Sequence, residues 1–218
     1  MQGGEYAPDG SPVPLYTALQ AFGEPELVHE AVPAGTTILE LGAGAGRITR
    51  GLLALGHPVV AVDESPQMIA HIERAETVLS DIRSLALGRR FPVVLLASNF
   101  VNDPDRARVR DYLRCCAEHV LPEGQVLVQG YPRDWRPDSE WHDLGAVRSR
   151  LRSFVLDGRQ LRGEMEYVVD GRSLFHAFEA LLVSDSELDE DLQAVGLVRR
   201  RTLDPRGAWI EAVPVRSA

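Results

Sequence analysis

The chain has 218 residues, of which 44% are apolar and 25% charged, a mix typical of one globular domain of ordinary size. Its formal net charge of -9 disfavours a polyanion such as nucleic acid as its partner. All 23 basic residues are arginine, which excludes Schiff-base chemistry on lysine and the Gly-Lys-Ser/Thr of a phosphate-binding P-loop.

Residues 1–35 are predicted to form an N-terminal arm followed by cap helices. Residues 1–14 are rich in glycine and proline and look like a loose arm, and apolar spacings between Leu15 and Val32 predict two short helices. No apolar run typical of a signal peptide opens the chain, and no stretch of about 18 apolar residues occurs. We therefore expect a cytoplasmic protein without membrane contact.

From residue 36 to residue 131 the chain alternates short apolar runs with helical patterns. Strands are predicted over 37–41, 59–62, 78–79, 92–97 and 125–129, and helices over 48–55, 65–75 and 106–120. Strands separated by helices indicate crossover connections, so this half is expected to form a parallel sheet with helices on its faces.

Residues 132–218 follow an antiparallel pattern instead. Residues 133–143 are polar and aromatic and predict an irregular loop. Asp-Gly turns at 157–158 and 170–171 separate strand-like runs over 150–156, 160–169 and 173–183, which predict a β-meander. A helix over 187–195 and strands over 198–203 and 208–215 complete an α/β fold of about seven strands, in one domain overall.

The glycine-rich turn after the first strand carries the strongest functional signal. Gly42, Gly44 and Gly46 occupy alternate positions and Glu40 precedes them, so the backbone can approach a ligand without an intervening Cβ atom. A dinucleotide-binding turn needs a third glycine at position 47, where Arg47 stands, which disfavours a Rossmann dehydrogenase. The pattern favours a ligand without phosphate whose amino group can meet Glu40.

Asp63 ends the second strand 21 residues after Gly42, and its two carboxylate oxygens suit a ribose diol. With the segments 62–68, 80–82, 97–100 and 122–125, this order resembles the motifs of the class I S-adenosylmethionine-dependent methyltransferases. The resemblance covers residues 36–130 and, more loosely, residues 174–213. It implies a Rossmann-like doubly wound sheet, S-adenosylmethionine as cofactor and an enzyme that transfers its methyl group.

The resemblance also implies the cofactor contacts. Asp63 would bind the ribose hydroxyls, Met68 would pack beside adenine, and Asp81 would accept from the adenine amino group with Ile82 near the ring. Three alternatives stay open: Asp63 as a helix cap, Asp81 as a plain turn residue and Met68 as core packing. The expected cofactor-binding residues are Glu40, Gly42, Ala43, Gly44, Gly46, Asp63, Glu64, Met68, Asp81, Ile82, Ser98 and Asn99.

Fewer signals define the acceptor side. Methyl transfer depends mainly on alignment, and a base is needed only for some nucleophiles. The catalytic candidates are His142, His176 and Tyr131, of which His142 lies in the loop expected to overhang the pocket mouth. The expected acceptor walls are Tyr16, Phe100, Trp135 and Trp141, with Phe154 as a further apolar candidate. No His, Cys and Asp cluster has metal-ligand spacing, so no metal is expected.

The predicted function is therefore methyl transfer to an oxygen or nitrogen of a small molecule, by a monomer or homodimer. The first alternative is a protein or RNA methyltransferase that uses a basic patch of Arg148, Arg150 and Arg152 with the arginines at 199–201. The second is a cyclase or regulator that binds S-adenosylmethionine and transfers no methyl group.

Overall fold

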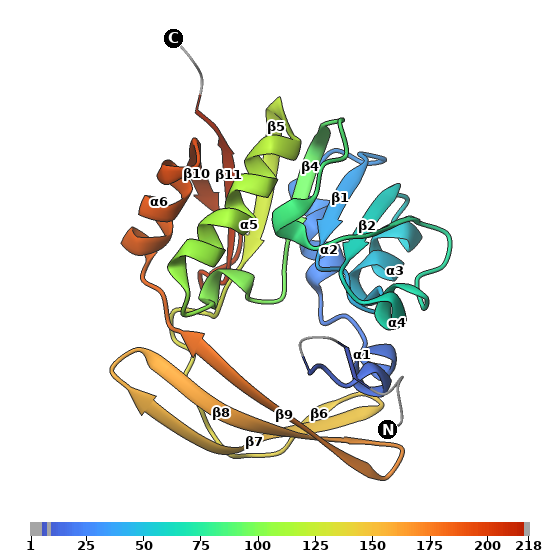
Figure 1. Cartoon of the computed structure of the whole chain (residues 1–218), viewed down its shortest axis with the longest axis vertical. Coiled ribbons are helices and arrows are strands. Elements are labelled where there is room, and N and C mark those ends of the chain that lie inside the picture. Colours follow the sequence, from blue (N-terminus) through green and yellow to red (C-terminus); the bar gives the residue numbers. More distant parts are fainter. Residues whose placement is uncertain (1–5, 8–9, 216–218) are drawn as a thin grey trace.

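The computed structural model, which describes residues 6–7 and 10–215, contains a seven-stranded sheet of order β10-β11-β5-β4-β1-β2-β3 (Figure 1). The first five strands along the chain pair in parallel, and the last two are antiparallel. The predicted fold of about seven mostly parallel strands with an antiparallel C-terminal part is confirmed. The strands are β1 (Ile38–Leu41), β2 (Val59–Asp63), β3 (Glu76–Leu79), β4 (Phe91–Leu96), β5 (Val120–Gln129), β10 (Leu197–Thr202) and β11 (Trp209–Pro214).

Helices cover both faces of this sheet because its strands are apolar on both sides. Leu39 and Leu41 of β1 pack toward α5 (Arg106–His119) and α6 (Asp185–Ala194), whereas Ile38 packs toward α2 (Glu24–Ala31) and α3 (Arg47–Ala54). Two single-turn 3-10 helices, Ile82–Ser84 and Phe100–Asn102, follow β3 and β4. Among the helices that the structure describes, none is both long and apolar enough to cross a membrane.

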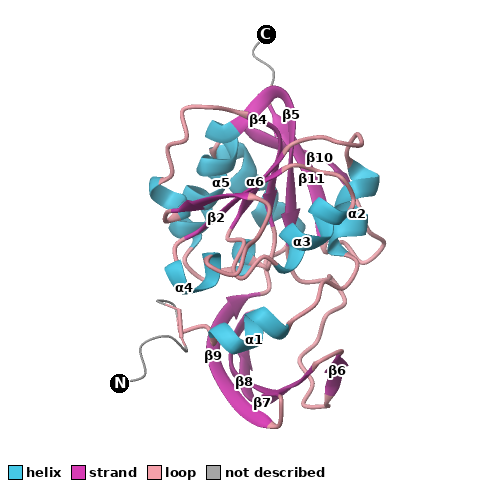
Figure 2. Cartoon of the chain, turned by 90° about the vertical axis from the view of Figure 1, so that its right-hand side faces the viewer, coloured by secondary structure: helices cyan, strands magenta, loops and turns pink. Residues whose placement is uncertain are grey.

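The meander forms a second sheet, which lies opposite one end of the main sheet as a separate layer (Figures 1 and 2). Its antiparallel strands are β6 (His142–Leu144), β7 (Val147–Asp157), β8 (Gln160–Val169) and β9 (Arg172–Leu181). The short helix α1 (Val13–Ala18) lies on one face of this sheet, where Leu15 packs against Val147 and Val169. We call this unit of β6–β9 the cap sheet.

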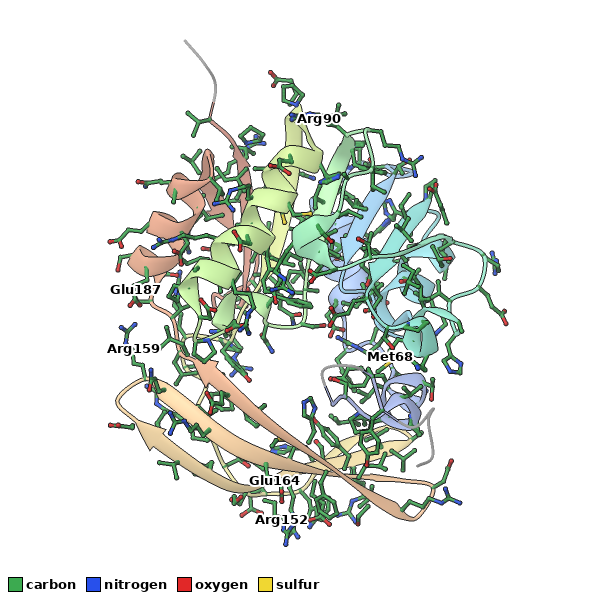
Figure 3. All side chains as sticks on the ribbon, in the orientation of Figure 1. Met68, Arg90, Arg152, Arg159, Glu164 and Glu187 are labelled. Atoms are coloured by element: carbon green, nitrogen blue, oxygen red, sulfur yellow. The ribbon has the colours of Figure 1, made fainter. Side chains whose placement is uncertain are left out.

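Contacts among the described residues attach the cap sheet to the main body at both of its chain connections and at the β7–β8 turn. The buried carboxamide of Asn102 donates to the Leu181 carbonyl at the end of β9 (2.7 Å) and accepts from the Tyr131 backbone N–H after β5 (3.0 Å). It therefore joins both chain connections between the two sheets. At the β7–β8 turn, Arg159 pairs with Glu187 of α6 (Figure 3).

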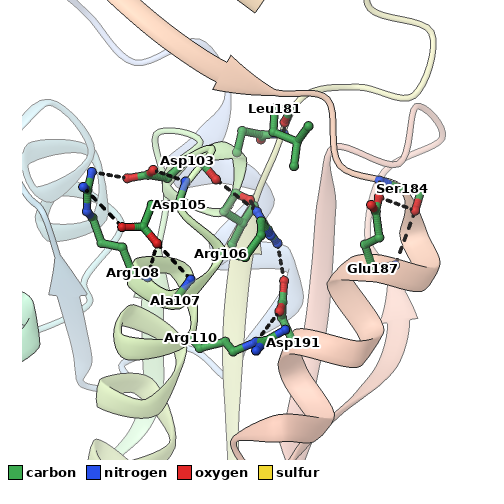
Figure 4. Close-up of polar contacts among 12 residues, drawn as sticks. Asp103, Asp105, Arg106, Ala107, Arg108, Arg110, Leu181, Ser184, Glu187 and Asp191 are labelled. Carbon is green, nitrogen blue, oxygen red and sulfur yellow. Dashed lines mark hydrogen bonds and ion pairs between the residues drawn. The ribbon is translucent and has the colours of Figure 1, made fainter. Parts of the chain in front are cut away.

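A buried charge network holds the segment after β4, close to one of these contacts (Figure 4). Asp191 of α6 accepts from Nη2 of Arg106 and from Nε of Arg110, the latter at 2.7 Å. Nη1 of Arg106 donates in turn to the Val101 carbonyl (2.7 Å). This network fixes the loop that leads from β4 into α5.

Two local predictions are wrong. The helix expected over 65–75 is only α4 (Pro66–Ile69), because the chain must return to the sheet in time for Glu76 of β3 to pair with Val60 of β2. The described part of the arm is not loose, since the Ala7 N–H donates to the Ser11 carbonyl (2.8 Å) and Ala7 packs on Met68. Residues 1–5 and 8–9 of the arm lie outside the described residues.

Candidate active site

A cavity of about 840 Å³ lies between the carboxyl ends of the parallel strands and the cap sheet. Ligands of open α/β sheets bind at this edge because the loops after successive strands meet there. The sequence-predicted residues in its lining are Tyr16, Glu40, Gly42, Ala43, Gly44, Asp63, Glu64, Met68, Asp81, Ile82, Ser98, Asn99, Phe100 and His176.

The glycine turn forms one wall of the cavity. Gly42 and Gly44 have φ values of +70° and +57°, which residues with a Cβ atom rarely adopt. A Cβ on Gly42 would overlap the ring of Phe100, so the absence of a side chain lets that ring cover the turn. Gly46 lies outside the lining, and a Cβ there would come within 2.9 Å of Ile72, which gives this glycine a packing role.

Asp63 connects the end of β2 to the glycine turn. Its Oδ2 accepts from the Gly44 N–H (2.7 Å) and its Oδ1 from the Ser65 N–H (2.9 Å), so it braces the turn and the start of α4. A carboxylate offers about four lone-pair directions, so one side chain can hold a turn and also face a ligand. Asp63 both holds the start of α4, which Ser65 caps, and lines the cavity.

Glu40 is almost fully buried beneath the same turn. Burial raises the pKa of its carboxyl from near 4.5 to about 7, although the hydrogen bond from Thr49 Oγ1 to its Oε2 (2.6 Å) and the positive charge of Arg47 act in the opposite direction. The carboxyl is thus poised to ionise near neutral pH. A cation that entered the cavity would stabilise its charged form.

The third motif lies at another part of the wall. Oδ1 of Asp81 accepts from the Arg83 backbone N–H (2.8 Å) and from Arg83 Nε (3.0 Å), and the guanidinium lowers the pKa of this carboxyl. Asp81 is therefore a turn residue, and it also lines the cavity. Met68 and Ile82 are buried and present apolar surface on either side of the motif.

The turn after β4 is strained at the cavity. Ser98 and Asn99 are consecutive non-glycine residues in the left-handed conformation, with φ values of 60° and 62°. The Ser98 N–H donates to Gln129 Oε1 (2.8 Å), and the Phe100 ring meets Tyr112 edge to face at 5.2 Å. Surrounding contacts thus hold this turn open toward the ligand space.

The inner face of the cap sheet forms the opposite wall. Ser149 pairs with Tyr167 and Met165 pairs with His176 in the strand register, so these four side chains form a patch over the cavity. Burial raises the pKa of the Tyr167 phenol, which therefore stays protonated at neutral pH. Among the lining residues that the sequence did not predict are Leu144, Ser149, Met165 and Tyr167. Alternation along β8 indicated a shared face but not what that face would meet.

The structure corrects the expectation that residues 133–143 overhang the pocket. Neither Trp141 nor His142 lines the cavity. The His142 Nε2 atom contacts Asp138 Oδ1 (3.0 Å) on the surface, and the guanidinium groups of Arg148 and Arg150 stack on the Trp141 ring at 4.9 and 4.6 Å. Although His142 pairs with the lining residue Ser149, it lies on the edge strand β6 and is exposed, so its ring meets Asp138 at the surface instead of the cavity.

Three other candidates also lie outside the cavity lining. The Tyr131 ring stacks on Trp135 with centroids 4.6 Å apart, and burial raises the pKa of its phenol, which disfavours it as a base at neutral pH. Phe154 is 39% exposed near the β7–β8 turn. Of the aromatic walls expected from the sequence, Tyr16 and Phe100 line the cavity.

Comparison with known proteins agrees with this geometry. Residues 38–124, which carry the glycine turn, Asp63 and Asp81, match the family model described as a methyltransferase domain. The chain therefore carries a methyltransferase domain over these residues, as the resemblance to the S-adenosylmethionine-dependent methyltransferases predicted. The predicted family and enzyme class are confirmed.

Among relatives, the methyltransferase is 26% identical over 190 residues to the ubiquinone biosynthesis O-methyltransferase of Bradyrhizobium diazoefficiens, with 75% of this chain and 72% of the relative covered. Two solved structures share the fold. An S-adenosylmethionine-dependent methyltransferase from Clostridium acetobutylicum has a TM-score of 0.72 at 14% identity, with 88% of this chain and 91% of that chain covered. A sugar N-methyltransferase from Streptoalloteichus has a TM-score of 0.70 at 19% identity, with 92% and 88% covered.

The residues at the cavity fit the cofactor of this family. The glycine turn leaves backbone accessible, Asp63 provides acceptor capacity for a diol, and Met68 and Ile82 provide apolar surface for a base. Within residues 6–7 and 10–215, no group of three or more His, Cys, Asp or Glu side chains is arranged to hold a metal ion.

Proposed function

We propose that this methyltransferase binds S-adenosylmethionine along the glycine turn and transfers its methyl group to a hydroxyl oxygen or amine nitrogen of a small molecule. The observation that carries the proposal is a single cavity with two unlike walls. One wall carries the cofactor motifs at Gly42, Asp63 and Asp81, and the other is the inner face of the cap sheet. Residues 36–131 would thus bind the cofactor, and residues 1–35 and 132–218 would supply the cap and complete the main sheet.

When bound, S-adenosylmethionine would supply a methyl group on a sulfonium, and its sulfur would leave as a neutral thioether when the acceptor takes that methyl group. The chain contributes alignment, which is worth about 7–11 kcal/mol when both reactants are held in place. His176 is the candidate base for a hydroxyl acceptor because it lines the acceptor wall of the cavity. The protonated Tyr167 phenol can donate a hydrogen bond to the acceptor beside it.

The character of the acceptor wall supports a small, largely uncharged acceptor. The residues that the described cap sheet contributes to the cavity are Leu144, Ser149, Met165, Tyr167 and His176, and none of them is an acid, an arginine or a lysine. A volume of about 840 Å³ is in the range of small-molecule sites. The activities named for two similar proteins, an O-methyltransferase of ubiquinone biosynthesis and a sugar N-methyltransferase, agree with oxygen or nitrogen as the acceptor atom.

The basic patch of the RNA alternative is neutralised by acidic side chains. On the cap sheet, Arg150 pairs with Glu166 (2.6 Å) and Arg152 with Glu164 (2.8 Å). The second pair lies on the face turned away from the main sheet (Figure 3). Arg148 pairs with an acidic neighbour in the same way, and so do the arginines at 199–201. These pairs support a small molecule over a nucleic acid. The cytoplasmic location and the monomeric or homodimeric state stay predictions.

The test has two parts. Calorimetry should detect S-adenosylmethionine binding at micromolar to millimolar cofactor, and no binding there would refute the proposal. A panel of phenols, catechols and amino sugars is then screened by mass spectrometry for S-adenosylhomocysteine release. Binding without release by any panel member would favour a protein that transfers no methyl group, and transfer to RNA would favour the rejected alternative.

The role of His176 is tested with any hydroxyl acceptor found. We expect His176→Gln to lower kcat about 100-fold or more for a hydroxyl acceptor, and only a few-fold for an aromatic amine that is already unprotonated at the assay pH. His142→Gln is the matched control, since His142 lies on the surface outside the cavity lining. Equal losses for both acceptor types would refute a base role for His176.

A further inference from the structure

A charged pair lies in the cavity wall outside the predicted cofactor contacts. Arg47 is the first residue of α3 and Glu24 the first residue of α2, and both line the cavity. Arg47 Nη1 donates to Glu24 Oε1, and Glu24 Oε2 accepts from the Phe22 backbone N–H. The two side chains are only 17% and 9% exposed, so the pair is largely desolvated.

The Arg47 guanidinium has donors to spare. In the described part of the chain, its hydrogen bond is the one from Nη1 to Glu24, whereas a guanidinium carries five N–H groups in a planar fork. That fork matches the two oxygens of a carboxylate. Because Arg47 lines the cavity and carries more donors than this ion pair uses, it is suited to bind an anion there.

The charges around Arg47 alternate along the wall. Its positive charge acts on the neighbouring Glu40 carboxyl, so Glu24, Arg47 and, once it is ionised, Glu40 form a series of negative, positive and negative charges. The other arginines in the described lining are Arg83 and Arg108, which pair with acidic residues of the segments after β3 and β4. Of these three lining arginines, Arg47 is therefore the one beside Glu40, the carboxyl that is predicted to meet an amino group.

An amino acid group is a zwitterion and needs both signs of charge close together. If Glu40 receives the amino group of S-adenosylmethionine, its α-carboxylate lies one carbon away and needs a nearby cation. We propose that Arg47 binds the α-carboxylate of S-adenosylmethionine and that Glu24 is the positioning residue that holds the guanidinium at the cavity. The inference rests on the proposed function, because it assumes that S-adenosylmethionine enters this cavity.

The test compares S-adenosylmethionine with decarboxylated S-adenosylmethionine, which keeps the adenosine, sulfonium and amino groups and lacks only the carboxylate. Affinities are measured by calorimetry for the wild-type chain and for Arg47→Met. We expect the variant to bind S-adenosylmethionine about 10- to 100-fold more weakly, the range for a lost charge-assisted hydrogen bond, and decarboxylated cofactor within about twofold of wild type. Equal weakening of both ligands, or no weakening of either, overturns the inference.

Arg50→Met is the matched control, since it removes the same charge one turn along α3. Arg50 lies outside the cavity lining and donates to the Ala45 carbonyl (2.6 Å), so any effect should be equal for the two ligands. Glu24→Gln provides a second variant, which keeps Arg47 and weakens the charged hydrogen bond that positions it. We expect this variant to lower the preference for the carboxylated cofactor several-fold, and an unchanged preference overturns the positioning role of Glu24.

The outcome is separable from that of the proposed function. A wild-type chain that binds neither adenosyl ligand refutes the proposed cofactor. A wild-type chain that binds both with equal affinity keeps the cofactor and removes Arg47 from carboxylate recognition. Thermal unfolding of each variant identifies any loss of binding that comes from loss of the fold.

Discussion

The buried Glu40 carboxyl makes the free energy of unfolding of this methyltransferase depend on pH. The substitution Glu40→Gln should remove that dependence. Its pKa is raised to about 7 in the folded chain by burial, against a usual value near 4.5. Between these two values the folded chain keeps a proton that the unfolded chain has released. The stability that Glu40 contributes is therefore fully present below pH 4.5 and is lost as the pH rises through 7.

The size of the effect follows from the same two values. A difference of one in pKa corresponds to about 1.4 kcal/mol, so the rise from 4.5 to about 7 corresponds to about 3 kcal/mol in the free energy of unfolding. Glu40→Gln keeps a similar shape and can accept the Thr49 hydrogen bond, but it does not titrate. We expect the stability of the variant relative to wild type to increase by about 3 kcal/mol between pH 4.5 and pH 8.

Urea unfolding at four or five pH values measures this difference directly, because the other titrating groups are common to both chains. A difference between variant and wild type that stays constant within about 0.5 kcal/mol would refute the reasoning. Cofactor binding gives a second readout. If an ionised Glu40 meets the amino group, the affinity of wild type for S-adenosylmethionine should rise as the pH increases through 7, and that of Glu40→Gln should not.

Three further outcomes test the cavity and its attachment. Gly42→Ala should lower the free energy of unfolding by about 2 kcal/mol or more, because its φ is +70° and the new Cβ overlaps the Phe100 ring. The control Gly56→Ala has a φ of +86° and nothing within 4 Å of its Cβ, so it should lower that free energy by only about 1 kcal/mol. Equal losses in urea unfolding would contradict the overlap. Asp63→Ala should weaken S-adenosylmethionine binding about 100-fold in calorimetry, and an unchanged affinity would exclude this carboxylate from ribose recognition. Asn102→Leu removes both hydrogen bonds of the buried carboxamide and should cost about 2–4 kcal/mol; hydrogen exchange should then rise first at the ends of β5 and β9, and a rise spread evenly over the chain would speak against a local joint.

The cofactor half could be predicted because its signals are local in the sequence. A strand followed by alternating glycines and a helix fixes the backbone of the turn, and Asp63 must lie at the same sheet edge because β2 pairs in parallel with β1. The strand–turn–helix order and the pairing of successive strands are both readable from short segments of the sequence. They identify lining residues without any knowledge of how the cap sheet packs on the main sheet.

The acceptor half could be predicted only in part because its orientation depends on tertiary packing. Alternation placed Met165 and Tyr167 on one face of their strand, but sequence periodicity does not say whether that face meets solvent, core or cavity. The aromatic character of Trp141 suggested a pocket wall, yet its ring serves as a platform for two arginines on the surface. Tyr131 likewise stacks on Trp135, a half-buried contact that sequence periodicity does not reveal.

The two faces of the cap sheet perform different tasks, and this makes acceptor choice separable from stability. The outer face carries solvent-exposed pairs such as Arg152 and Glu164, each of which contributes little to stability. The inner face carries Met165 and His176, whose strand register fixes their spacing over the cavity. Because the carboxamide of Asn102 joins both connections of this sheet to the main body, inner-face substitutions should alter which acceptor binds without displacing the sheet. A change in acceptor preference is therefore expected from the inner face, and a change in cofactor affinity only from the glycine turn and its neighbours.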